Sequence, residues 1–212
     1  VPLPRQQSLR GRQRRLPQIV RRDRQAPMAA RLEWLRNDHG MMRSASSRGS
    51  GQIAVAEIKD TSGDVVGQAT ITAASETAEP VTINVRVTAG ELPAGFHGMH
   101  IHETGTCDAG AGGSQAFTSA GGHLQVDGNT DHPSSGDLIS INILEDHTGR
   151  TVTTTDAVTI QQLIGKSIMI HEKPDNFGNI PADKYPGGPN PDTLRTGDAG
   201  ARIACGVIEE QS

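Results

Sequence analysis

Apolar and polar residues alternate in short runs along residues 51–212, as they do in strands that bury one face. The runs are rich in Val, Ile and Thr, and turns that contain Gly, such as the one at 61–64, separate them. Many short strands joined by such turns favour an all-β sandwich or barrel. The pattern predicts eight strands, at 53–59, 65–72, 81–87, 95–102, 138–144, 151–156, 167–171 and 202–209.

Two long connections interrupt this regular spacing. Residues 103–136 are rich in Gly and Ser, and residues 172–201 are rich in Gly and Pro. Long loops on a rigid scaffold are usually either functional or disordered. Both loops flank histidines, so we expect them to carry the functional site.

Residues 1–50 differ from the remainder in charge. They hold twelve Arg, no Lys and three acidic residues, which gives +9; the whole chain is −4, so residues 51–212 carry −13. Without a sustained apolar run, this segment cannot bury enough surface to offset its ordering entropy. We therefore predict a disordered basic extension at 1–50, with a short helix near 29–36, followed by one domain at 51–212.

The basic extension is open to three interpretations. It could bind nucleic acid or an anionic membrane, act as a targeting segment, or be a dispensable addition from a wrongly chosen start codon. The sequence shows no apolar core of a secretory signal and no run of about 20 apolar residues, so no transmembrane segment is expected. With only five aromatic residues in the chain, a base-stacking surface and a nucleic-acid partner are not expected either.

A histidine pair suggests a metal site. His100 and His102 lie two residues apart on a predicted strand, so their side chains share one face. Copper and zinc both accept neutral imidazole. The pair alone is a weak signal, because such pairs also occur on exposed strands. His123 and His171 add two further candidate ligands next to the long loops.

Four motifs in a fixed order make the signal specific. They read GMHIHETGTC at 98–107, SAGGH at 119–123, IHEKPD at 170–175 and GDAGARIACGV at 197–207. Over roughly residues 51–209, the chain resembles the copper/zinc superoxide dismutases. The resemblance implies an eight-stranded Greek-key β-barrel with two long functional loops. It also implies copper-dependent dismutation of superoxide to oxygen and hydrogen peroxide, an antioxidant function.

The resemblance also assigns residues around copper. It implies that His100, His102 and His171 bind copper and not zinc. It also implies that His123 bridges copper and zinc and carries a proton during turnover. Further residues in the matching motifs are Arg202, which attracts the superoxide anion; Asp175, which bridges and orients ligand histidines; and Cys107 and Cys205, which form a disulfide. Thr196, just before the last motif, matches the family residue that narrows the channel. Lys173 and Arg195 are candidates to add a local positive field.

The zinc half departs from the family pattern. His132 and Asp137 match two zinc ligands beside His123, but Ser134 and Ser135 stand where a further histidine belongs. A structural zinc site prefers four protein ligands, and at most three remain. The sequence therefore leaves zinc binding open, and His132 is equally well read as a solvated loop residue.

Two functions follow from this set of residues. The first is an enzyme that uses copper, His123 and Arg202 to dismute superoxide. The alternative is a non-catalytic copper-binding or delivery module of the same fold, which the incomplete zinc half favours and the retained arginine disfavours. The implied disulfide favours an extracytoplasmic location, in the periplasm, the cell envelope or secreted. The missing export signal keeps the cytoplasm as the alternative, and a homodimer stays open because family members differ in assembly.

Overall fold

A computed structural model describes residues 51–211 apart from positions 78, 79, 89, 111, 131, 179, 182, 184, 185 and 187. The predicted extension at 1–50 and its short helix lie outside the described residues. The described part is almost entirely strand and loop. Its strands are β1 (Gln52–Asp60), β2 (Val65–Ala73), β3 (Val81–Val87), β4 (Gly95–His102), β5 (Asp137–Ile143), β6 (Gly149–Thr155), β7 (Ser167–His171), β8 (Arg202–Val207) and β9 (Glu209–Glu210).

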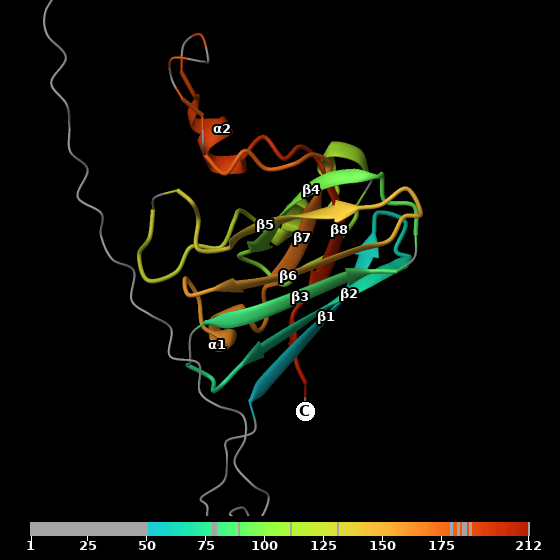
Figure 1. Ribbon diagram of the computed structural model, residues 1–212, viewed down its shortest axis with the longest axis vertical. Coiled ribbons are helices and arrows are strands. Elements are labelled where there is room, and N and C mark those ends of the chain that lie inside the picture. Colours follow the sequence, from blue (N-terminus) through green and yellow to red (C-terminus); the bar gives the residue numbers. More distant parts are fainter. Residues whose placement is uncertain are drawn as a thin grey trace, which may run out of the picture. The chain divides into compact units, whose positions relative to one another are not determined.

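The strands form a closed antiparallel barrel (Figure 1). They pair in the order β2-β3-β6-β5-β4-β7-β8-β1-β9, and a further pairing of β1 with β2 closes the sheet. The prediction of eight strands in an all-β barrel is confirmed, with small differences at the strand ends. The predicted last strand is divided into β8 and the two-residue β9, and both pair with β1.

The barrel interior is built from small and branched aliphatic side chains. Alternate residues of each strand point inward; on β1 these are Ala54, Ala56 and Ile58, all fully buried. The same alternation on β3 buries Ile83 and Val85. Because the side-chain period of a strand is two, this core fixes the strand register, and a slip by one residue would expose it.

A second, smaller core lies under the first long loop. Phe117 and Ala120 of this loop pack with Met169 of β7 and Cys205 of β8. The loop also contains two short 3-10 turns, η3 (Gly113–Gln115) and η4 (Thr118–Ala120). The predicted disulfide between Cys107 and Cys205 is present, with a Cα–Cα distance of 5.6 Å, and ties this loop to β8.

Two short helices complete the described structure, and the sequence pattern did not predict them. α1 (Ile160–Leu163) begins with a capping box between Thr159 and Gln162. α2 (Pro191–Thr196) lies in the second long loop; the Asn190 side chain caps its first turn, and Gly197 ends it in a left-handed conformation. Among the described residues, no helix has the length and apolar character needed to cross a membrane.

Candidate metal centre

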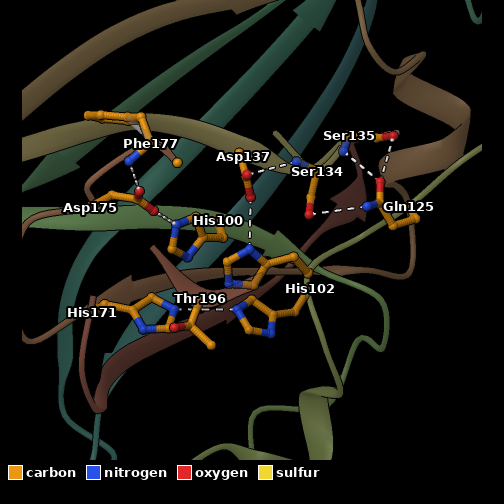
Figure 2. A network of polar contacts seen from close by, with 12 residues as sticks. His100, His102, Gln125, Ser134, Ser135, Asp137, His171, Asp175, Phe177 and Thr196 are labelled. Atoms are coloured by element: carbon orange, nitrogen blue, oxygen red, sulfur yellow. Dashed lines mark hydrogen bonds and ion pairs between the residues drawn. The ribbon is translucent and has the colours of Figure 1, made fainter. Parts of the chain in front are cut away.

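Four imidazoles converge on the outer face of the barrel, because Met99 and Ile101, the residues that alternate with His100 and His102 on β4, point into the core. β4 supplies His100 and His102, the neighbouring β7 supplies His171, and the first long loop supplies His123. Each ring offers one potential ligand nitrogen, Nδ1 or Nε2, and these four nitrogens all lie within 4.8 Å of one another. The four histidines that the sequence selected are thus brought together, and Figure 2 shows the arrangement around them.

His102 and His171 are oriented by carbonyl groups. Nδ1 of His102 lies 3.0 Å from the oxygen of Gly121, and Nδ1 of His171 lies 3.2 Å from the oxygen of Gly200. A carbonyl only accepts, so each Nδ1 carries the proton and each Nε2 presents a lone pair. The two Nε2 atoms face each other at 3.4 Å, which is an arrangement that a shared cation satisfies.

His100 presents its other nitrogen to the same point. Its Nε2 hydrogen-bonds to Oδ2 of Asp175, which leaves Nδ1 toward the cluster. This Nδ1 is fully buried and has no hydrogen-bond partner in the described part of the chain. A buried nitrogen without a partner is costly unless a ligand engages it. The donor set of four imidazoles with this orphaned atom therefore fits copper.

Burial keeps three of the four clustered histidines neutral. It lowers the pKa of His102 to about 2 and of His171 to about 3, and the nearby positive charge of Arg202 contributes in the same direction. Burial also lowers the pKa of His100, against the raising effect of its hydrogen bond to Asp175. Neutral imidazole is the form that binds a metal, so these rings are in the protonation state that metal binding requires.

Asp175 is held by the second long loop. Burial raises the pKa of this carboxyl, but hydrogen bonds from His100 and from the Phe177 main chain outweigh that effect and keep the pKa below its usual value. Its contacts differ from the predicted bridge between two ligand histidines, because the second oxygen accepts the Phe177 N–H instead. Gly197 has a positive φ of 60°, and a Cβ there would lie 2.2 Å from Oδ1 of Asp175, so this position requires glycine.

The fourth histidine is held by a carboxylate. Nδ1 of His123 donates to Oδ1 of Asp137 across 2.8 Å, while Oδ2 of Asp137 accepts the Ser134 N–H at 2.8 Å. The side chains of His123 and Asp137 are 9% and 18% exposed. His123 also forms an antiparallel bridge with His102, which fixes the loop against the end of β4.

The residues at the zinc position do not fit zinc. Nδ1 of His123 and both oxygens of Asp137 are engaged with each other or with the main chain. His132 is exposed and does not belong to any described group of three or more metal-ligating side chains, whereas Ser134 and Ser135 are buried. A four-ligand zinc site is therefore not formed by these side chains.

Arg202 lies beside the histidines at the start of β8. Its Nη1 and Nη2 donate to the oxygens of Phe117 and Gly121, each at 2.5 Å, and burial lowers its pKa without removing its charge. An open pocket of about 500 Å³ has Arg202 in its wall. Its other lining residues are His102, Gly122, His123, Gln125, Asn129, Thr130, His132, Ser134, His171, Arg195, Thr196 and Gly200.

The two other cations predicted to add a positive field, Arg195 and Lys173, differ in their position relative to the pocket. Arg195 lines the pocket, but its guanidinium is paired with Asp192 at 2.6 Å, which offsets its field. Lys173 is exposed and does not line the pocket. Sequence reasoning missed Gln125, which lines the pocket and hydrogen-bonds to the buried serines. Its one available signal is its position two residues after His123.

Comparisons with known proteins agree with this geometry. The family model for copper/zinc superoxide dismutase (SODC) matches residues 65–208. Proteins named Cu-Zn superoxide dismutase from Mycolicibacterium paratuberculosis and Mycobacterium tuberculosis are 50% and 48% identical over 141 residues, which is 60% of this chain. The match spans only 62% and 59% of those two proteins, whereas a relative from Deinococcus radiodurans is 30% identical over 73% of this chain and 82% of its own length. The chain belongs to the copper/zinc superoxide dismutase family.

Proposed function

We propose that this chain is a copper-dependent superoxide dismutase, which converts two superoxide anions and two protons into oxygen and hydrogen peroxide. The observation that carries the proposal is the convergence of four imidazole nitrogens, one of them buried without a partner, beside a guanidinium. When bound at these nitrogens, copper supplies one-electron redox chemistry.

Arg202 attracts and places the substrate. Two of its five N–H donors are used on main-chain oxygens, so the guanidinium is fixed in direction while the rest can meet an anion. It lines the same pocket as three of the histidines, which puts its positive charge where superoxide approaches. The domain is negative overall, so this local charge is what favours entry of an anion.

His123 is the group that can move a proton. Its Nδ1 already holds a proton toward Asp137, so Nε2 is the atom that can take up a second proton and release it to the peroxide product. The carboxylate of Asp137 stabilises the imidazolium that this produces. The other three rings are more deeply buried, which makes His123 the best placed of the four for exchange with solvent.

Copper loading followed by a superoxide assay tests the proposal. The protein should bind one copper per chain and accelerate superoxide decay. Stoichiometric copper with no turnover would overturn the proposal in favour of a copper-binding module. His123→Ala should lower the rate far more than His132→Ala, because the exposed His132 lies outside the cluster of four; equal losses would contradict the role given to His123.

We also propose an extracytoplasmic location. A disulfide with a buried half-cystine persists in oxidising compartments and is rare in the cytosol. Thiol labelling of the protein isolated from its native cells checks this: unreactive cysteines support the proposal, and two free thiols contradict it.

A further inference from the structure

A network of polar side chains stands where the zinc ligands are incomplete. Its members are Gln125, Asn129, Ser134 and Ser135, here called the Gln125 network (Figure 2 draws three of them). Ser134 and Ser135 are each only 5% exposed, although serine is usually a surface residue. Two adjacent buried serines indicate a built arrangement whose polar groups need partners.

Gln125 supplies those partners with both ends of its amide. Its Nε2 donates to Oγ of Ser134 at 3.2 Å, and its Oε1 accepts the N–H of Ser135 at 3.0 Å and the Asn129 amide at 3.0 Å. Oγ of Ser135 in turn accepts the N–H of Val126 at 3.2 Å. The side chain of Gln125 thus joins the segment that follows His123 to the two serines.

The serines belong to the turn that aims Asp137. The N–H of Asp137 donates to the oxygen of Ser134 at 3.0 Å, and the N–H of Ser134 donates back to Oδ2 of Asp137 at 2.8 Å. The free Oδ1 then accepts from Nδ1 of His123. A continuous path of contacts therefore runs from Gln125 through the turn at 134–137 to His123.

We propose that Gln125 is a positioning residue that replaces the orienting role of zinc at His123. By holding the turn, it keeps Asp137 on Nδ1, so the proton of the neutral ring stays on Nδ1 and the lone pair of Nε2 faces the copper histidines. A neutral amide suits this task, because the carboxylate next to it already carries the negative charge. The proposal rests on the proposed copper-dependent function.

Gln125→Met removes both amide contacts and retains the length of the side chain. In the copper-loaded full chain it should still bind one copper, since three imidazoles on the strands are unchanged. Its Cu(II) electron paramagnetic resonance spectrum should shift toward that of His123→Ala, and its superoxide rate should fall about tenfold. Gln68→Met, on the exposed face of β2, is the matched control and should leave both unchanged.

A second variant keeps the test decisive if Gln125→Met does not fold. Ser134→Ala removes only the hydroxyl that accepts from Gln125 and leaves the main-chain contact to Asp137, so it should shift the spectrum in the same direction by less. After the wild-type protein has been incubated with both copper and zinc, metal analysis should find copper and no zinc. A wild-type spectrum and rate in both variants, or stoichiometric zinc in the wild type, would overturn the proposal. A wild type that binds copper without turnover would instead refute the proposed function, while the spectral comparison would still decide the role of Gln125.

Discussion

Replacing both half-cystines by alanine tests how much the first long loop contributes to stability and to the arginine geometry. The disulfide closes a segment of 98 residues between Cys107 and Cys205. Closing a loop of that length in the unfolded chain stabilises the folded state by about 4.7 kcal/mol in the chain-entropy treatment. Alanine is the suitable substitute, because Cys205 is buried and a serine hydroxyl there would need a partner.

The expected change in melting temperature follows from the size of the domain. For a domain of 150–250 residues, each kcal/mol corresponds to about 2–4 °C. The double variant should therefore melt roughly 10–20 °C below the wild type in calorimetry of the metal-free protein. Wild-type protein whose disulfide has been fully reduced should have the same melting temperature as the variant, and it serves as the control for the two alanine substitutions. A difference below about 4 °C between oxidised wild type and variant would refute the loop-closure reasoning.

The same variant should also alter how the rate depends on salt. The carbonyl groups that hold Arg202 belong to Phe117 and Gly121, in the loop that the disulfide ties to β8. When that tie is removed, the guanidinium loses its fixed direction, so the rate should fall and depend less on ionic strength. A salt profile equal to that of the wild type would show that the second core under the loop is sufficient to place Arg202.

Three further predictions follow from the site. Arg202→Ala should lower the superoxide rate at low salt by about tenfold or more and flatten its decline with added salt; stopped-flow rates with a steep decline in the variant would contradict this. In the metal-free protein, burial lowers the pKa of His102 and His171 to about 2 and about 3 from 6.5, so the unfolded chain binds more protons below pH 6.5. The free energy of unfolding should therefore fall with decreasing pH, with a slope approaching about 2.7 kcal/mol per pH unit, and urea titrations that show no slope would disprove it. Gly197→Ala should weaken copper binding about tenfold in calorimetric titrations by displacing the carboxylate that it touches. Gly178→Ala, which has the same left-handed backbone and no atom within 4 Å of its added Cβ, should not, and equal effects of the two would refute the steric argument.

The barrel could be predicted from the sequence because each strand carries its own signal. Alternation over 81–87, for example, gives the same bounds as β3, and the histidine pair falls on the shared face that the strand period requires. Pairing order could not be read from alternation, since every strand presents a similar inner face. The resemblance implied a Greek-key barrel, and the order of the strands is known from the structure.

The short helices were missed although their end signals are present. Asn190 and Pro191 begin α2 and Gly197 ends it, which is a complete pair of start and stop signals around six residues. A helix of this length has no apolar periodicity to detect, and its Gly- and Pro-rich surroundings read as loop. Of its two residues in the pocket wall, Arg195 was selected for its charge alone, and Thr196 was visible only through the resemblance.

The four histidines differ in what holds them, and this difference explains which part of the site the sequence could predict. His100, His102 and His171 lie on paired strands whose register is fixed by the barrel core, so their convergence follows from the fold. His123 lies on a loop and is held by Asp137 at the start of β5, and Gln125 and two buried serines form the contacts around the turn before Asp137. Hydrogen bonds of this kind give no periodic pattern in the sequence, because they form only when two separate turns come together in the folded chain. This division suits the proposed function, in which three strand-held rings keep a metal site in place and the less deeply buried His123 exchanges a proton with solvent.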